Sequence, residues 1–328
     1  MKIGILGAGS IAVVMANTLN GMKQNGENVE LYAVAARDEE RAATFAKEHG
    51  FEKSFGSYEE MLSDEELKLV YIATPHSHHF EHVKLCLEHG KNVLCEKSFM
   101  ANAKQAVEII AMAEQKKLLL TEAIWTRYMP SRDMLNDVIA SRIIGKVTSL
   151  SANLGYVINS VPRIMDPALA GGALLDLTVY PINAALMIFG DDIKKIDAMC
   201  VKTETGVDGQ DNVVFTYGDG KMATMYTTVF AQSDRRVMIN GDKGYIQVEN
   251  VNNYEAIKVY NLERELMKEI PVPEQITGYE YEVRAAMKAI MEGRIECPEM
   301  SHSETIKVMK IMDKIREIYD IKFPFEIE

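Results

Sequence analysis

The sequence predicts an α/β protein of two domains, with a doubly wound parallel sheet first and then an α+β domain with a largely antiparallel sheet. The chain has 328 residues, about twice the usual size of a single domain. Over the first third, short apolar runs alternate with helical patterns, which is typical of parallel βαβ units. After Thr121 the strand patterns gather in one block instead. We therefore expect domains over residues 1–121 and 122–328.

The first domain reads as buried strands joined by helices. Asp38 can cap the second helix and Gly50 can end it, because aspartate accepts an orphan N–H bond and glycine adopts a left-handed turn. Ser57 and Glu60 form a capping-box pattern at a further helix start. We expect strands at 2–6, 29–36, 67–73, 93–95 and 118–120, and the longer helices at 10–20, 38–49, 80–89 and 103–115.

The second domain begins with helical patterns and continues with strands. One helix is expected at 131–141, and another enters at Gly172. Alternating strands follow over 193–261, with glycine-rich hairpin turns at 218–220 and 241–244. Two helices end the chain, at 279–292 and 304–319, and Ser301 with Glu304 forms a capping box before the second.

Charge and cysteine content exclude several classes of protein. The 36 Lys and Arg residues against 48 Asp and Glu residues give a net charge of −12, which argues against a general nucleic-acid or anionic-membrane surface. The four cysteines form no CxxC pair, as expected of reduced thiols in a cytoplasmic protein. No stretch approaches the roughly 18 uninterrupted apolar residues of a membrane span. We expect a cytoplasmic protein with a small-molecule partner.

A glycine pattern, Gly7-x-Gly9-x-x-Ala12, follows the first strand and opens the first helix. Gly7 permits the tight turn, Gly9 lets the backbone approach a pyrophosphate, and Ala12 can replace the third glycine where helix meets strand. The N–H groups at the helix start, around Ser10 and Ile11, then bind the phosphates. This pattern in a βαβ context predicts a Rossmann dinucleotide site.

The tip of the second strand favours NADP over NAD as the cofactor. An acidic residue there would accept a bond from the ribose 2′-OH, whereas arginine favours a 2′-phosphate. The strand ends in Ala35-Ala36-Arg37, and Asp38 is better used as a helix cap. A solvated surface position for Arg37 is the alternative, so NAD stays possible.

Four segments, which begin at Gly7, Ala73, Cys95 and Gly171, together resemble the Gfo/Idh/MocA oxidoreductases. The run from Glu122 to Pro130 and the pair Tyr180-Pro181 look most like the dimeric dihydrodiol dehydrogenase and glucose-fructose oxidoreductase branch of this family. Two departures leave the reacting groups in place, since Ser98 replaces a common proline and Ala170 replaces the first of three glycines. The resemblance implies cofactor contacts from Thr74, Pro75, His76, His79, Glu96 and Lys97. The segments are Gly7 to Ala12, Ala73-Thr74-Pro75-His76-Ser77-His78-His79, Cys95-Glu96-Lys97-Ser98, and Gly171 to Pro181.

Alcohol oxidation by a nicotinamide needs a base for the hydroxyl proton. Asp176 and Tyr180 are four residues apart on a predicted helix, so both lie on one face. Lys97 follows a strand at the sheet edge that binds ligands in this fold. An ammonium beside a phenol lowers the phenol's pKa. We therefore expect Tyr180 to be the general acid/base, Lys97 to lower its pKa and bind the reacting oxygen, and Asp176 to orient a neighbouring hydroxyl. The competing assignment makes Lys97 the proton carrier.

Other residues invite weaker interpretations. The histidines of residues 76–82 suggest a metal site, but cofactor contacts by this loop explain them better and no further ligands complete a site. Trp125 offers an apolar face to a ring, and Arg127 offers a donor fork to hydroxyls or a carboxylate. Core packing and a surface salt bridge are the respective alternatives. Arg163 is a weaker substrate-binding candidate.

The resulting hypothesis is an NAD(P)-dependent oxidoreductase acting on a small polyhydroxylated or vicinal-diol substrate, such as a sugar, a sugar derivative or a trans-dihydrodiol. The alternative is a non-catalytic dinucleotide-binding sensor on the same fold, and an imine or biliverdin-type reductase is a further option among enzymes. Alternating apolar positions in the second-domain sheet, such as Val213 and Met225, suggest a homodimer formed through one of its faces.

Overall fold

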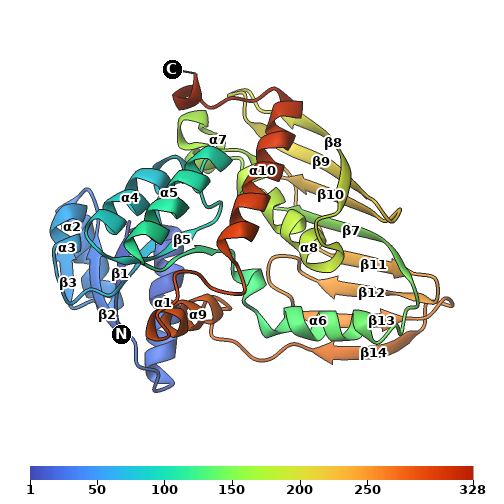
Figure 1. Ribbon diagram of the computed structural model, residues 1–328, viewed down its shortest axis with the longest axis horizontal. Helices are drawn as coiled ribbons and strands as arrows, with labels where there is room; N and C mark the ends of the chain where they lie inside the picture. Colours follow the sequence, from blue (N-terminus) through green and yellow to red (C-terminus); the bar gives the residue numbers. More distant parts are fainter. Residues whose placement is uncertain (328) are drawn as a thin grey trace. The chain divides into compact units, whose positions relative to one another are not determined.

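The structure, a computed structural model, describes residues 1–327 and divides the chain into two compact units (Figure 1). The first unit comprises Met1–Tyr128 and Gln275–Met309, and the second comprises Met129–Glu274 and the chain from Lys310 onward. The sequence pattern suggests a single boundary near residue 121. The structure also assigns Gln275–Met309 to the first unit, which the sequence pattern did not predict.

The first unit is built on a six-stranded sheet with the strand order β3-β2-β1-β4-β5-β6. All its pairs are parallel, which confirms the predicted doubly wound parallel sheet. Buried apolar side chains fill both faces of its strands, as is usual when helices cover both sides. The short edge strand β3 was not predicted. The strands are β1 (Lys2–Leu6), β2 (Glu30–Ala35), β3 (Lys53–Phe55), β4 (Leu69–Ile72), β5 (Asn92–Glu96) and β6 (Leu120–Ala123).

Helices cover this sheet in two groups (Figure 1). One group consists of α4 and α5, which pack together, while α1 contacts α2 and the late helix α9. Asp38 caps α2 through the N–H of Arg41 at 3.0 Å, and Gly50 ends it in a left-handed conformation, as expected. The helices are α1 (Ser10–Gln24), α2 (Glu39–His49), α3 (Tyr58–Leu62), α4 (His79–Glu88), α5 (Ala103–Lys116) and α9 (Glu280–Met291), with short turns η1 (His76–His78) and η2 (Trp125–Arg127).

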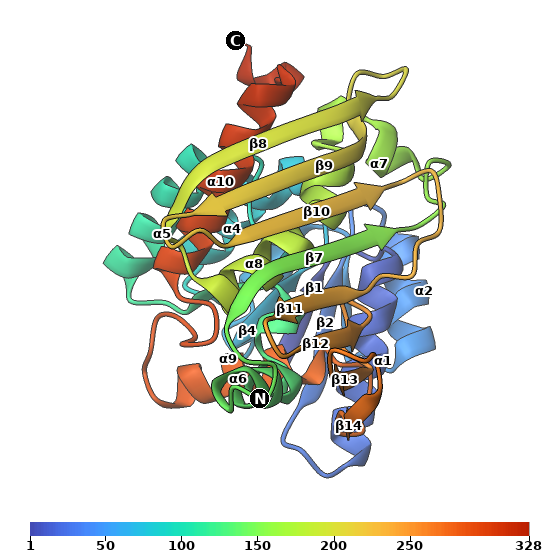
Figure 2. The same cartoon turned by 90° about the vertical axis from the view of Figure 1, so that its right-hand side faces the viewer.

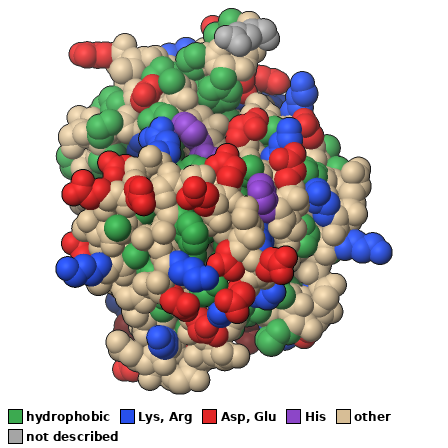
Figure 3. Space-filling model, turned by 90° about the vertical axis from the view of Figure 1, so that its left-hand side faces the viewer, with side chains coloured by type: hydrophobic (Ala, Val, Ile, Leu, Met, Phe, Trp, Pro, Cys, Tyr) green, Lys and Arg blue, Asp and Glu red, His purple; other side chains and the backbone are tan. Residues whose placement is uncertain are grey.

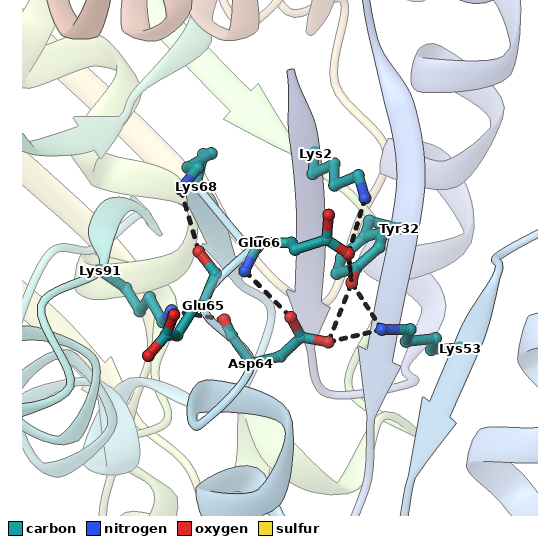
Figure 4. A network of polar contacts seen from close by, with 8 residues as sticks. All are labelled: Lys2, Tyr32, Lys53, Asp64, Glu65, Glu66, Lys68 and Lys91. Carbon is teal, nitrogen blue, oxygen red and sulfur yellow. Dashed lines mark hydrogen bonds and ion pairs between the residues drawn. The ribbon is translucent and has the colours of Figure 1, made fainter.

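A polar network ties together the amino ends of the strands, at the edge opposite the glycine loop (Figure 4). The Tyr32 hydroxyl lies 2.9 Å from both Asp64 Oδ2 and Glu66 Oε2. Lys53 Nζ donates to Asp64 Oδ2 at 2.7 Å, and Lys2 pairs with Glu66 at 3.0 Å. These contacts connect β1, β2, β3 and the segment before β4 at a place remote from ligand chemistry.

The network makes stability depend on acidity. The hydrogen bond from Lys53 lowers the pKa of Asp64 to about 2. A lowered folded-state pKa stabilises the fold above pH 4, and this contribution is lost as pH falls from about 4 to 2. We expect Asp64→Asn to lower the free energy of unfolding by about 1 kcal/mol at pH 7, allowing for solvent screening. Urea unfolding should show this deficit shrinking in acid, whereas Glu65→Gln in the same loop should match wild type at each pH.

The second unit contains an eight-stranded sheet with the order β14-β13-β12-β11-β7-β10-β9-β8. Its pairs are antiparallel except for β7 with β10, which confirms the largely antiparallel sheet. The strands β7 and β14 lie outside the predicted strand block 193–261 and were not predicted. The strands are β7 (Val147–Gly155), β8 (Ile193–Lys202), β9 (Asp208–Tyr217), β10 (Met222–Thr228), β11 (Val237–Gly241), β12 (Gly244–Glu249), β13 (Ala256–Tyr260) and β14 (Leu266–Pro271).

One face of this sheet packs on helix α8, which contacts β7 and β10. The predicted alternating residues Val213, Phe215 and Met225 all point to this side and are fully buried. Figure 2 looks onto the opposite face, with the strands in front of α8. The unit's helical elements are α6 (Pro130–Ala140), α7 (Pro162–Met165), η3 (Pro167–Leu169), η4 (Leu174–Thr178), α8 (Val179–Phe189) and η5 (Pro324–Glu326), and α10 (His302–Tyr319) runs from one unit into the other.

One segment among the described residues, Pro167–Phe189, is long and apolar enough to cross a membrane, with a mean hydropathy of 1.5. However, 83% of its apolar 18-residue window is buried inside the structure, as in the core helix of a soluble protein. It is weak evidence for a membrane span, because α8 has a core-packing role within its own unit.

Acidic side chains are spread over the face shown in Figure 3, with lysine and arginine side chains among them. This agrees with the net charge of −12. An anionic ligand must therefore be held by local donors rather than by the general field of the protein.

Candidate active site

The glycine loop lies where the order of the first sheet reverses, between β1 and β4. Ligands of open α/β sheets bind at such a switch point. Gly7 has φ +104°, and a Cβ there would come within 2.9 Å of the Ala73 carbonyl oxygen. The loop after β1 thus packs against the end of β4, and only glycine fits at this point.

The start of α1 has the features of a phosphate site. Gly9 is the N-cap, and a Cβ at this position would meet nothing within 4 Å. The first turn, which begins at Ser10 and Ile11, contains no acidic residue. The first N–H groups of a helix have no intrahelical partner and carry partial positive charge, so this open cradle fits a pyrophosphate.

Two arginines stand beside this loop at the end of β2. Arg37 is exposed, as the sequence suggests. Arg41, which was not predicted, donates from Nε and Nη2 to the carbonyl oxygen of Ala8 at 3.1 and 2.6 Å. Burial raises the pKa of Tyr58, and both guanidinium groups act in the opposite direction. Arg37 and Arg41 therefore form a basic cluster on an otherwise acidic protein.

The loop after β4 contains the predicted residues Thr74, Pro75 and His76. The side chain of His79 contacts the backbone of this loop. The His79 side chain is fully buried. Its Nδ1 lies 2.9 Å from the Ser98 carbonyl oxygen, and its Nε2 lies 2.8 Å from that of Thr74. His79 thus connects the loop after β4 to the segment after β5, and both of its nitrogens contact backbone.

Burial favours the uncharged form of three histidines in this segment. His82 Nδ1 lies 2.9 Å from the Thr74 hydroxyl, and burial lowers the pKa of His82 to about 4. Burial also lowers the pKa values of His78 and His79. Within residues 1–327, no group of three or more His, Cys, Asp or Glu side chains could hold a metal ion.

Lys97 follows β5 at the ligand-binding edge of the sheet and is half-buried. The preceding Glu96 accepts the Lys97 N–H at 3.1 Å and the hydroxyl of Tyr71. The peptide bond from Lys97 to Ser98 is cis. Beyond it, the N–H of Phe99 donates to Glu122 Oε1 at 3.2 Å. Buried carboxylates on neighbouring strands therefore hold the backbone on both sides of Lys97.

Trp125 and Arg127 both take part in contacts within the first unit. Trp125 stacks on Tyr279, with ring centroids 4.1 Å apart. Arg127 is only 3% exposed and pairs with Glu304 at 3.2 Å. Trp125 therefore packs against another aromatic ring, and Arg127 forms an ion pair, which are the alternatives that the sequence left open. The guanidinium of Arg127 is buried, so this ion pair is not a surface one.

In the second unit, Asp176 and Tyr180 lie at the start of the α8 segment, 5% and 6% exposed. The sequence predicts an ordinary α-helix here. The structure instead has a π-helical turn, η4, over Leu174–Thr178, and α8 begins after it. Asp176 is inside this wide turn, and Arg163 Nη1 donates to its Oδ1 at 2.9 Å. Asp176 thus lies in the π-helical turn and Tyr180 in the α-helix that follows, so the two residues belong to different helix types and not to one ordinary α-helix.

Known proteins match the chain over almost its full length. The family model for an oxidoreductase family with an NAD-binding Rossmann fold matches residues 1–124, and the Gfo/Idh/MocA C-terminal domain model matches residues 133–247. The chain belongs to the Gfo/Idh/MocA oxidoreductase family. It is therefore an NAD(P)-dependent oxidoreductase, as the sequence motifs suggest.

Curated relatives of this Gfo/Idh/MocA protein include trans-1,2-dihydrobenzene-1,2-diol dehydrogenases. The Sus scrofa enzyme is 34% identical over 99% of the chain and 98% of its own length, and the Homo sapiens enzyme is 33% identical over the same shares. Among solved structures, a 3-ketoreductase from Actinomadura kijaniata in complex with NADP and TDP-benzene has a TM-score of 0.87 at 22% identity, with 97% of each chain covered. A levoglucosan dehydrogenase in complex with NADH and levoglucosan has a TM-score of 0.84 at 20% identity, covering 97% of this chain and 96% of its own.

Sequence reasoning missed several residues of this Gfo/Idh/MocA protein that bear on its site. Arg41 sits within an exposed acidic helix start, and nothing in its local pattern distinguishes it from a surface arginine. Glu282, Asp208 and Asp211 are buried carboxyls on elements whose pattern is otherwise ordinary. The signal that could have pointed to the aspartates is the run Asp208-Gly209-Gln210-Asp211, because such residues are disfavoured in a strand.

Proposed function

We propose that this protein transfers a hydride between NADP and a small polyhydroxylated or vicinal-diol substrate, such as a trans-dihydrodiol, a sugar or a sugar derivative. The observation that carries the proposal is the open phosphate cradle at Gly7 and Gly9 with Arg37 and Arg41 beside it. The full-length similarity to trans-dihydrodiol dehydrogenases supports the substrate class.

The proposed roles divide between the two units. A nicotinamide held by the first unit would supply the acceptor for the hydride of the carbinol carbon. In the second unit, the phenolate oxygen of Tyr180 takes the substrate hydroxyl proton and becomes the neutral hydroxyl, and Asp176, held by Arg163, orients a neighbouring hydroxyl. In the first unit, Lys97 binds the reacting oxygen and favours the phenolate of Tyr180 through its positive charge. Glu96 fixes the backbone of Lys97 by accepting its N–H.

The substrate is tested by following NADPH formation over a panel of sugars, inositols and trans-dihydrodiols. Turnover of at least one vicinal diol or sugar with NADP supports the proposal. Tight NADP binding without turnover on any member of the panel, or on the corresponding ketones with NADPH, would contradict it.

The cofactor preference should depend on the two arginines. Arginine binds a 2′-phosphate through charge-assisted hydrogen bonds. We expect Arg37→Ala to raise the KM for NADP by about tenfold or more, the cost of roughly one such contact, with the KM for NAD nearly unchanged. Steady-state kinetics with both cofactors measures this. Lys47→Ala, at the far end of α2, is the control; equal losses with NAD and NADP for Arg37→Ala would remove it from 2′-phosphate recognition.

We further propose that the protein is a homodimer through the sheet face that Figure 2 shows. The side chains on this face of the central strands are uncharged and partly exposed, which suits burial against a second copy. Light scattering at micromolar concentration should give twice the chain mass, and a monomer would overturn the proposal. These residues are Ser149, Ser151 and Asn153 of β7, Asn212, Val214 and Thr216 of β9, Thr224 and Tyr226 of β10, and Met238 and Asn240 of β11.

A further inference from the structure

The π-helical turn that carries Asp176 is held by groups from strand β9. A π-turn inserts an extra residue into a helix, and such turns are rare and frequent at functional sites. Here the turn spans Leu174–Thr178, and Tyr180 is the second residue of the α-helix that follows. The direction in which Asp176 and Tyr180 point therefore depends on what stabilises this turn.

Asp208, the first residue of β9, holds the beginning of the turn. It is 3% exposed, and its Oδ2 accepts the N–H of Leu174. A Cβ on Gly172, which has φ +118°, would lie 2.3 Å from Asp208 Oδ1. The missing side chain of Gly172 thus makes room for the Asp208 carboxylate, which satisfies a helix-start N–H and complements the positive end of the helix.

Asp211, on the same strand, holds the end of the turn. Its Oδ2 lies 2.7 Å from the Thr178 hydroxyl, which also lies 2.6 Å from the hydroxyl of Thr227. The same Thr178 hydroxyl lies 3.2 Å from the carbonyl oxygen of Ala173, five residues earlier. Thr178 and Thr227 are fully buried and Asp211 is 1% exposed. Side chains of β9 therefore form hydrogen bonds with both ends of the π-helical turn, and Asp176 lies between these two contacts.

Burying these two carboxyls is costly. Burial raises the pKa of both, and the neighbouring Asp208 carboxylate raises that of Asp211 further. Well-packed apolar residues often stabilise a core as well as buried charged groups do. The contacts of the aspartates go to the two ends of a turn that bears candidate site residues, which points to a geometric role rather than to general stabilisation.

We propose that Asp208 and Asp211 are positioning residues, which hold the turn Leu174–Thr178 and thereby set the orientation of Asp176 and Tyr180 for proton transfer. The inference rests on the proposed function for its catalytic consequence. Its structural part, that these two carboxyls hold the turn by hydrogen bonds, does not depend on the proposed function and is measured separately by amide hydrogen exchange.

The test uses two pairs of variants in the full chain saturated with NADP. Thr178→Val and Asp211→Leu remove the hydrogen bond between Thr178 and Asp211 at the end of the turn. Thr178→Ser and Asp211→Asn retain a hydrogen-bonding group of similar shape. Three quantities are measured for each variant: kcat and KM for the best substrate, Kd for NADPH by fluorescence, and amide hydrogen exchange of peptides covering 172–182.

We expect Thr178→Val and Asp211→Leu to lower kcat by about 30- to 100-fold, as a displacement of about 1 Å at a reacting group can do. The Kd for NADPH should be unchanged, since the cofactor residues belong to the first unit. Exchange should increase within 172–182 and remain at wild-type levels in peptides of β11 to β14. The serine and asparagine variants should restore both exchange protection and most of kcat.

Wild-type kcat and wild-type exchange in Thr178→Val and Asp211→Leu would overturn the proposal. The proposal would also be overturned if amide exchange rose uniformly over the whole second unit while kcat per NADPH-binding site stayed unchanged. The aspartates would then contribute only to the stability of that unit. If the wild-type protein turns over no substrate, the proposed function fails, and the exchange pattern within 172–182 still decides whether these carboxyls hold the turn.

Discussion

Replacing Tyr180 with phenylalanine is expected to lower kcat by about 100- to 1,000-fold, the usual contribution of a general acid/base. The substitution removes one hydroxyl from a side chain that is 6% exposed, so the packing of the ring is retained. The Kd for NADP should stay within about twofold of wild type, because a group that acts only in the chemical step does not bind the cofactor. Single-turnover measurement with saturating NADP isolates the step.

Tyr217→Phe is the matched control, because Tyr217 is a buried tyrosine of the same unit whose hydroxyl has no hydrogen-bond partner among the described residues. It should retain full activity. Near-normal turnover in Tyr180→Phe would remove Tyr180 from the role of proton carrier. The competing assignment to Lys97 would then gain support if Lys97→Met lost activity while its Kd for NADP stayed normal.

Glu282→Gln should stabilise the protein in mildly alkaline solution, by about 2 kcal/mol at pH 8, the order of the cost of a buried polar group without a partner. Glu282 on α9 is fully buried, and neither carboxyl oxygen has a hydrogen-bond partner within residues 1–327. Burial first, and then the nearby carboxylates of Glu96 and Glu122, raise its pKa well above the usual range. The glutamine variant removes the charge and preserves the shape.

The sign of this effect follows from proton binding. When the folded state has the higher pKa, it binds more protons than the unfolded chain, and stability falls as pH rises above the unfolded value of about 4.5. The advantage of Glu282→Gln should therefore be small at pH 5 and grow toward pH 8. Guanidinium unfolding at both values measures it, and an equal effect at both pH values would contradict the assignment.

The neighbouring Glu280 provides a contrast for the same experiment. It is 1% exposed, yet its carboxylate accepts the N–H groups of Ile276, Thr277 and Gly278 at 2.8, 3.1 and 2.7 Å. Glu280→Gln weakens these bonds and should destabilise the protein at both pH values. Glu280 and Glu282, two positions apart on α9, thus have opposite expected effects. Within residues 1–327, only the carboxylate of Glu280 has hydrogen-bond partners.

Sequence reasoning predicted the first sheet well because its signals are local. Each long strand is a buried apolar run, and caps such as Asp38 and Gly50 act within a few residues of their position. The exception in the first sheet is β3, which has only three residues. In the second sheet, β14 (Leu266–Pro271) lies beyond the predicted strand block 193–261, and β7 (Val147–Gly155) lies before it. Three residues are too few to show a strand pattern, whereas β7 has the alternation typical of a half-buried strand, which sequence reasoning missed.

The site was harder to predict because its supports are distant in sequence. The contact of Asp208 with Leu174 joins residues 34 positions apart, and that of His79 with Ser98 joins residues 19 apart. The π-turn Leu174–Thr178 is contacted at its two ends by Asp208 and Asp211, which lie more than 30 positions further along the chain. Motifs therefore located Lys97, Asp176 and Tyr180 in the chain, whereas the groups that hold them became visible only in three dimensions.

The late return of Gln275–Met309 to the first unit has a consequence for synthesis on the ribosome. The β1 to β6 sheet is translated early, but α9, which packs on α1 and β5, follows Tyr128 only after more than 140 further residues. At about 5–20 residues per second, this delay is roughly 7–30 seconds. During that interval the nascent nucleotide-binding unit exposes the surface that α9 later covers, so its N-terminal fragment should be a client for chaperones until α9 has been translated.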